Sequence, residues 1–165
     1  MTTRHRDRER GTISIFVAIG SSMMMLFLGI VLDAGGELRA VVNADAMAQE
    51  AARVGAQQID KVLLFEKGKY GIDATAAENA VKAYLDQDPA FQGVPVEVVW
   101  PPVPPPQPPA DGSSPPPPQY TSITVHISPT YRTALLGLFG ESSLTIEGTG
   151  TATLVVNGEP VKADS

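Results

Sequence analysis

The sequence contains no cysteine and only two histidines, His5 and His126. Without cysteine there can be no disulfide framework, thiolate zinc site, iron–sulfur cluster or cysteine nucleophile. Two histidines leave almost no material for a histidine metal site or a catalytic triad. The net charge of −6 argues against a nucleic-acid partner, because such binders normally carry a basic surface.

Charged residues are also missing from residues 12–32, TISIFVAIGSSMMMLFLGIVL, between Arg10 and Asp33. As a helix this run would measure roughly 30 Å, the thickness of a bilayer core. The alternative is a cleaved secretory signal, whose apolar region is about 7–15 residues long and ends at a small-residue cleavage site. The run is longer than that, and the sequence after Leu32 is a poor cleavage site. We therefore predict an uncleaved transmembrane anchor over residues 11–32.

The charges on either side of the anchor predict its orientation. Residues 1–10 carry four arginines and two acidic residues, a net charge of +2, and the rest of the chain has a net charge of −8. The more basic flank of a membrane helix stays in the cytoplasm. The expected arrangement is a single-pass protein of the cell membrane, with residues 1–10 as a basic cytoplasmic tail and residues 33–165 outside.

Within the anchor, Ser14, Ala18 and Ser22 recur at intervals of four and share one helix face. Small residues at this spacing let membrane helices approach closely, although the same spacing also arises by chance. The three residues are candidates for helix packing, and they allow a homo-oligomer formed through the helices.

Two further helices are expected. Residues 37–60 are rich in strong helix formers, and one face carries mostly small or apolar residues, so residues 33–60 should extend the anchor either as a spacer or as a partner-binding helix. Residues 61–72 are expected to be a connection. Thr75 and Glu78 form a capping box for the next helix, with Asp73 as an alternative cap, and the pair Asp88-Pro89 should end it.

The rest of the chain predicts strands. Residues 94–100, 122–127 and 144–156 alternate apolar and polar side chains, the pattern of half-buried strands. Gly148 and Gly150 suggest a bulge, and residues 131–139 a short helix with Gly140 as its C-cap. Eleven of the fifteen prolines lie in residues 101–118, which cannot form sheet and should be a polyproline II loop, with Trp100 and Tyr120 at its feet able to stack on prolines. The expected fold is α+β: an anchor with a helical extension, then residues 61–165 with a small antiparallel sheet of about three strands packed on helices.

No motif in the sequence carries catalytic or cofactor chemistry. The carboxylates are scattered, and phosphate-loop and serine-nucleophile motifs are absent. His126 lies on the polar face of its strand and is interpreted as a solvated side chain. Asp45, on the mostly apolar helix face, could cap a neighbour or pair with Arg39 or Arg53. We therefore expect no catalytic residue, cofactor or metal.

The order of several segments resembles the TadE/TadG-like family, small membrane proteins of tight-adherence (Flp-type) pilus systems. The segments are Gly11 before the apolar span, Asp33-Ala34-Gly35-Gly36 at its end, an Ala-rich helix with a central Asp45, and the closing residues 133–140 and 143–152. In processed pilin-like members a glutamate stands five positions after the cleaved glycine, where this chain has Phe16. The chain is thus more similar to the unprocessed, TadG-like branch, and cleavage after Gly11 is left open.

The resemblance implies a non-enzymatic component of pilus assembly, or of a related secretion or adhesion apparatus, that acts through contacts with other pilus or secretion proteins. Two alternatives come from other classes. One is a membrane-tethered module that binds cell wall or a secreted partner through the proline loop and the sheet. The other is a tethered hydrolase, which would need two carboxylates that converge in a cleft.

Overall fold

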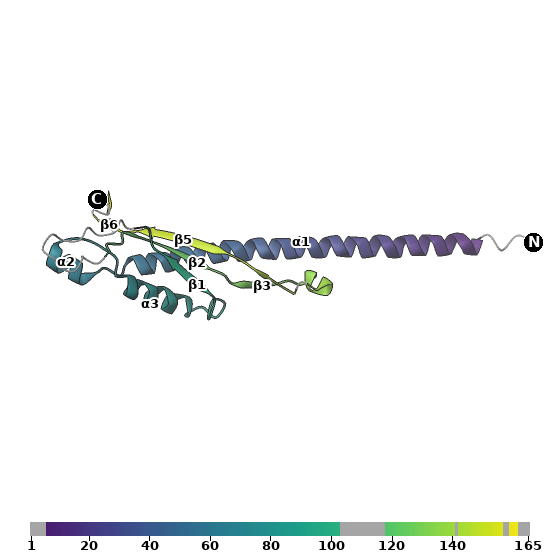
Figure 1. Ribbon diagram of the computed structural model, residues 1–165. Coiled ribbons are helices and arrows are strands. Elements are labelled where there is room, and N and C mark those ends of the chain that lie inside the picture. The colour runs from purple at the N-terminus through teal and green to yellow at the C-terminus, as the bar shows by residue number, and fades with distance from the viewer. Residues whose placement is uncertain (1–5, 103–117, 141, 157–158, 162–165) are drawn as a thin grey trace, which may run out of the picture. The chain divides into compact units, whose positions relative to one another are not determined.

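A computed structural model describes residues 6–102, 118–140, 142–156 and 159–161 (Figure 1). Most of the proline-rich segment, residues 103–117, and the start of the basic tail, residues 1–5, lie outside the described residues. The chain divides into two compact units, Met1–Arg39 with Tyr131–Leu144 (unit 1) and Ala40–Thr130 with Thr145–Ser165 (unit 2). The first helix contributes to both units, and different segments of the chain pack against it in each.

Helix α1 spans Arg6–Ala56 and takes in the apolar run and its predicted extension. It is long and apolar enough to cross a membrane. The paired glycines Gly35 and Gly36 do not interrupt it. It ends four residues earlier than predicted, because the backbone of Ile59 forms an antiparallel bridge with Ile72 and is therefore extended.

Residues 61–72 were predicted to be a connection. They also include a helix, α2 (Lys61–Lys67). The Asp60 carboxylate caps its start and accepts a hydrogen bond of 2.9 Å from the Leu63 N–H. Gly68 ends it in the left-handed conformation, with φ of 65°. An acidic residue and a glycine at the two ends are ordinary helix boundaries, but seven residues are too few for a periodicity argument.

Helix α3 (Ala74–Leu85) buries Ala77, Val81 and Leu85, the face that the sequence predicts. Of the two caps proposed for it, the structure uses Asp73, whose carboxylate accepts the Ala76 N–H at 3.0 Å. The box of Thr75 and Glu78 does not form, since Glu78 instead accepts a hydrogen bond of 3.3 Å from the indole N–H of Trp100. The Trp100 ring stacks on Tyr120 with centroids 4.7 Å apart.

Strands β1 (Val96–Val99), β2 (Ser122–Ile127) and β5 (Gly148–Thr153) form an antiparallel sheet in the order β1-β2-β5. The α+β class and the small antiparallel sheet are therefore confirmed. The last predicted strand is divided into β4 (Ser143–Thr145), β5 and β6 (Val155–Val156), and β6 pairs with β7 (Glu159–Pro160).

Gly148 and Gly150 do not form a bulge, because they pair in register with Ile127 and Val125 of β2. Their lack of a side chain has another cause. A Cβ atom at Gly148 would overlap the backbone of Ala44, and one at Gly150 would overlap the backbone of Ala48. The two glycines therefore let β5 lie directly against α1.

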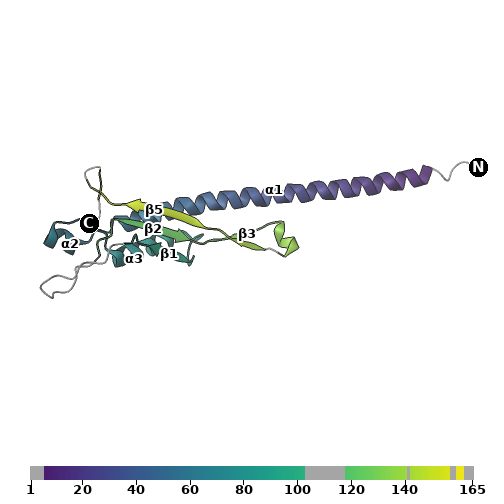
Figure 2. The same cartoon turned by 45° about the horizontal axis from the view of Figure 1, so that its top comes forward.

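The core of unit 2 forms where α1, α3 and the sheet meet, and Figures 1 and 2 show the sheet beside both helices. Gly55 of α1 marks the meeting point, since a Cβ there would come within 2.9 Å of both Val81 in α3 and Ile123 in β2. The fully buried side chains come from all three elements: Ala44, Ala48, Ala51, Ala52, Ala77, Val81, Ile123, Val125 and Ile127. Alanines on the helix make the close approach possible.

The predicted helix over residues 131–139 is mostly wrong. Strand β3 (Thr130–Arg132) pairs with β4, and the Thr133 N–H donates to the carbonyl oxygen of Ser142, so the segment is a hairpin. Only its tip is helical, as the 3₁₀ turn η1 (Leu136–Phe139). Gly140 caps that turn with φ of 103°, which confirms the predicted C-cap.

Candidate functional site

Asp33, the first charged residue after the apolar run, holds the hairpin tip within unit 1. Its side chain is 2% exposed. One carboxylate oxygen accepts the backbone N–H of Ala134, and the other accepts those of Leu135 and Leu136, each at 2.8 Å. A single side chain thus accepts hydrogen bonds from three consecutive amides more than 100 residues away in sequence.

Two glycines flank this carboxylate on the same helix face. Gly29 lies four residues before Asp33 and Gly36 three residues after it, the spacing of neighbours on a helix surface. A Cβ at Gly29 would overlap the side chain of Leu135, and one at Gly36 would overlap the hydroxyl of Tyr131. We call Gly29, Asp33 and Gly36 the helix seat, and Tyr131–Gly137 the clamped turn.

The seat is an anionic site. The Leu136 amide, followed by the Ala134 amide, lowers the pKa of Asp33, and the Leu135 amide adds to this, while burial opposes it. Backbone N–H donors stabilise the charged form of a carboxylate. Asp33 is therefore ionised at neutral pH, and the dipoles of the three backbone amides stabilise its charge.

Asp45 does not pair with an arginine, contrary to one of the expectations from sequence. Its carboxylate accepts the backbone N–H of Thr149 in β5 at 3.0 Å. Arg53 instead pairs with Glu50, at 2.7 Å. The expectation considered only residues of the same helix, whereas the partner lies in a strand 104 residues later in the sequence.

Gln49, one helical turn after Asp45, continues the same contact. Its side-chain oxygen accepts the Thr151 N–H at 3.3 Å, and its side-chain nitrogen donates to the Thr151 carbonyl oxygen at 2.7 Å. The amide thus pairs with β5 as a neighbouring strand would. These two side chains cover the edge of β5 that β2 does not use, and a covered edge cannot recruit another strand.

Two acidic residues and a histidine share one hollow on unit 2. Glu97, His126 and Glu147 line an open hollow beside β1 and β2. The Nδ1 atom of His126 lies 3.0 Å from the Thr149 hydroxyl, so this side chain has a protein partner and is not only solvated. Among the residues that the structure describes, no group of three or more His, Asp or Glu side chains could hold a metal ion.

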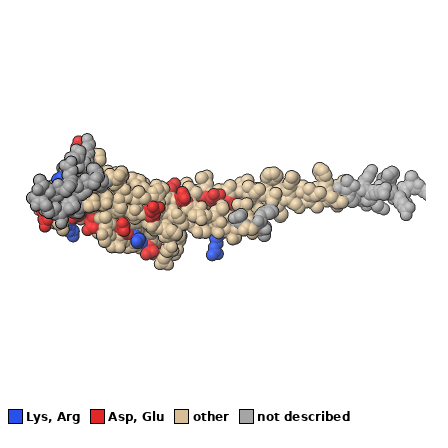
Figure 3. Space-filling view, viewed as in Figure 1, with Lys and Arg blue, Asp and Glu red and all other residues tan. Residues whose placement is uncertain are grey.

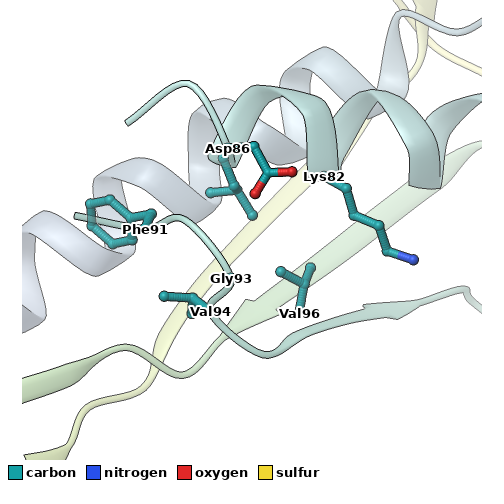
Figure 4. Close-up of a pocket in the computed structure, with 7 residues that line it drawn as sticks. Lys82, Asp86, Phe91, Gly93, Val94 and Val96 are labelled. Carbon is teal, nitrogen blue, oxygen red and sulfur yellow. The ribbon is translucent and has the colours of Figure 1, made fainter. Parts of the chain in front are cut away.

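A second hollow, between α3 and β1, is lined by Lys82, Leu85, Asp86, Phe91, Gly93, Val94 and Val96 (Figure 4). Figure 4 shows the Lys82 amine and the Asp86 carboxylate pointing in different directions. Buried Phe91 and Leu85 belong to the hydrophobic core. The hollow therefore brings one acid and one base to its rim but does not make them converge.

The remaining positions predicted from sequence lie on α1. Ser14, Ala18 and Ser22 are exposed. The Ser22 hydroxyl donates to the Ala18 carbonyl oxygen at 2.8 Å, so it is satisfied within its own helix. Gly11 lies inside α1, and a Cβ at Gly35 would meet no atom within 4 Å. Of the family-motif positions, Asp33 and Asp45 thus make tertiary contacts, in unit 1 and unit 2 respectively.

Comparisons of the chain with models of protein families, with curated proteins and with solved structures find no match. The expected relation to the TadE/TadG-like family therefore rests on the motif residues alone. The helix seat was not predicted from the sequence as a contact site. The available signal was an acidic residue, flanked by glycines at helical spacing, directly after an apolar run.

Proposed function

We propose that this chain is a membrane-anchored, non-enzymatic component of a tight-adherence pilus assembly, or of a related secretion or adhesion apparatus, and that it acts through protein–protein contacts. Its first helix would be the anchor, with the N-terminus in the cytoplasm and the sheet-containing unit outside the cell membrane. The proposal draws on the family resemblance and on the surface of α1.

One observation carries the proposal: the apolar side chains of α1 before Asp33 are exposed. Ile13, Phe16, Met25 and Leu32 are 64%, 80%, 75% and 68% exposed. Figure 3 shows this stretch of the helix, next to the grey N-terminal residues, without a charged side chain on the visible face. A helix of this kind needs a nonpolar environment, which a bilayer or neighbouring helices supply.

The second part of α1 supports a structural role rather than a catalytic one. Its alanines are buried against the sheet, and its polar residues Asp45 and Gln49 satisfy a strand edge. The helix that leaves the membrane is therefore the same helix that organises the folded unit.

The small-residue face supplies a specific contact for partner helices. Ala18 and Ser22 leave room for a neighbouring backbone, whereas the bulky Phe16 lies about 200° around the helix from Ala18. Close approach of a second helix is therefore expected on the face of Ser14, Ala18 and Ser22, either from another copy of this chain or from another membrane protein of the apparatus.

Deletion of the gene, with complementation by the natural chain and by variants, tests the proposed function. We expect deletion to abolish surface pili and adherence, and the natural chain to restore them. Ala18→Leu should fail to restore them, because the larger side chain blocks helix approach, whereas the matched control Ile15→Leu should restore them. Unchanged pili and adherence after deletion would contradict the proposal. If Ala18→Leu restores pili and adherence, the small-residue face is not a contact for partner helices.

A further inference from the structure

We propose that the clamped turn is a second membrane contact, which reaches the border between the phospholipid headgroups and the hydrocarbon core in the leaflet from which α1 emerges. This inference rests on the proposed membrane anchor. It adds that the chain touches the bilayer at two places far apart in sequence, the helix run 12–32 and the tip of the β3–β4 hairpin.

The depth of the helix seat supports this contact. Gly29 lies three residues before Leu32, the last residue of the apolar run, which corresponds to about 4.5 Å along a helix axis. Leu135 packs at Gly29 so closely that a Cβ there would overlap it. If the run 12–32 spans the bilayer, Leu135 reaches the same depth as the last turn of the span.

The chemistry of the turn suits that depth. From Thr133 to Gly137 the clamped turn reads TALLG and contains no charged residue. Backbone N–H groups that enter a bilayer must find partners within the protein, because lipid tails offer none. The Asp33 carboxylate accepts hydrogen bonds from three consecutive amides of the turn. These N–H groups therefore need no partner from the bilayer.

The residues at the start of the turn are those that occupy membrane–water interfaces. Tyr131 is half-buried, with its hydroxyl at Gly36, and Arg132 is exposed. Aromatic rings with a polar end are enriched at the headgroup level. An arginine side chain can extend its charged group to phosphate while its stem stays on apolar surface. We therefore infer a phospholipid surface as the partner, in continuity with the anchor.

Spin labels on single cysteines in the full chain, reconstituted in phosphatidylcholine–phosphatidylglycerol vesicles, test the contact. The chain has no cysteine, so each label reports one position. The positions are Ala134→Cys in the turn, Phe27→Cys in the anchor and Val155→Cys in unit 2, three exposed sites. Power-saturation measurements compare the access of oxygen, which enters lipid, with that of a water-soluble nickel chelate.

We expect the Ala134 label to be more accessible to oxygen and less accessible to nickel than the Val155 label, with a depth between those of Val155 and Phe27. Asp33→Asn should shift the Ala134 label toward the Val155 value and leave the Phe27 label unchanged, because the turn is released while the helix stays in the membrane. A clamp that only stabilises the fold, without lipid contact, would leave nickel access high in both variants.

Two results would overturn the inference without affecting the anchor. In the first, the Phe27 label lies in lipid while the Ala134 label matches Val155. In the second, the Ala134 label is shielded from both oxygen and nickel, which indicates a protein cover. A Phe27 label as accessible to nickel as the Val155 label would instead contradict the membrane anchor, and with it both proposals.

Discussion

The two units hold different parts of the same helix, and their contacts differ in kind. In unit 2, the glycines of β5 face the backbone of α1 at Ala44 and Ala48. In unit 1, the glycines of α1 face side chains, those of Leu135 and Tyr131. Backbone cannot move away from an added atom, whereas the end of a side chain can rotate. The contact in unit 2 is therefore rigid, and the one in unit 1 is adjustable.

Polar contacts follow the same division. Unit 2 distributes them over Asp45 and Gln49 and adds a core of fully buried aliphatic residues. Unit 1 places three amide hydrogen bonds on the single carboxylate of Asp33. Loss of one group should thus weaken unit 2 only in part, but it should release the clamped turn of unit 1 almost completely.

The largest expected effect is that of Gly150→Val. The new side chain would overlap the backbone of Ala48 and Gln49, so β5 could not lie against α1. We expect the free energy of unfolding of unit 2 to fall by at least about 3 kcal/mol, the upper range of overpacking, or the unit not to fold. Denaturant unfolding of the full chain in detergent measures it through the fluorescence of Trp100, the single tryptophan.

Gly35→Ala is the matched control, because a Cβ there meets nothing within 4 Å. In a helix interior, replacing glycine by alanine should stabilise the helix by about 0.5–1 kcal/mol. The unfolding free energy of unit 2 should be unchanged or slightly higher. If Gly150→Val unfolds at the same denaturant concentration as the natural chain, the strand and the helix are not in rigid contact.

An intermediate effect is expected for Gln49→Ala. The variant loses both hydrogen bonds to Thr151 and uncovers part of the β5 edge. The unfolding free energy of unit 2 should fall by about 1 kcal/mol, the typical net contribution of such bonds. Glu50→Ala is the control next to it, since the exposed Glu50–Arg53 pair should contribute less than about 0.5 kcal/mol. Equal losses in the two variants would contradict the strand-like role of Gln49.

The smallest expected effect on unit 2 is that of Asp33→Asn, which should leave the Trp100 unfolding curve unchanged. Its effect should be confined to the clamped turn, where an amide cannot accept all three N–H bonds. Hydrogen exchange at Ala134, Leu135 and Leu136 should become roughly tenfold faster or more, because buried donors lose a charged acceptor. A shifted Trp100 curve would show that the two units are energetically coupled.

The same carboxylate gives a pH dependence with a definite sign. The folded-state pKa of Asp33 is lowered from the usual value of 3.8. The stability that the ionised Asp33 carboxylate gives to the clamped turn is therefore fully present above about pH 4. It is lost as the pH falls through the lowered pKa. A label at Ala134 should keep its neutral-pH mobility down to about pH 4 and become mobile only in stronger acid, and Asp33→Asn should be mobile throughout.

Local patterns predicted a large part of the fold correctly. The alternation in residues 122–127 gave β2 its bounds, and the apolar spacing in α3 gave its buried face. Gly140 was predicted as a C-cap because a left-handed residue at that place is a local requirement. In each case the cause lies within a few residues of the effect.

The missed features are those whose partners lie far away in sequence. The helix predicted over residues 131–139 has the composition of a helix, but hairpin pairing and the Asp33 carboxylate use its backbone N–H groups. Asp45 has two arginines in the same helix, Arg39 and Arg53, yet it bonds to β5. Gly148 and Gly150 suggested a bulge because only their own strand was considered. The helix that requires their small size lies about 100 residues earlier in the sequence.

The sequence by itself determined the extent of the charge-free run, the α+β class and the small-residue faces of α1, because these follow from hydropathy, periodicity and side-chain size. Only the tertiary structure decided which groups face one another: Asp33 with the turn amides, and Asp45 and Gln49 with the edge of β5. Pairing of this kind depends on how the chain returns to its first helix. No local pattern in a single sequence records that return.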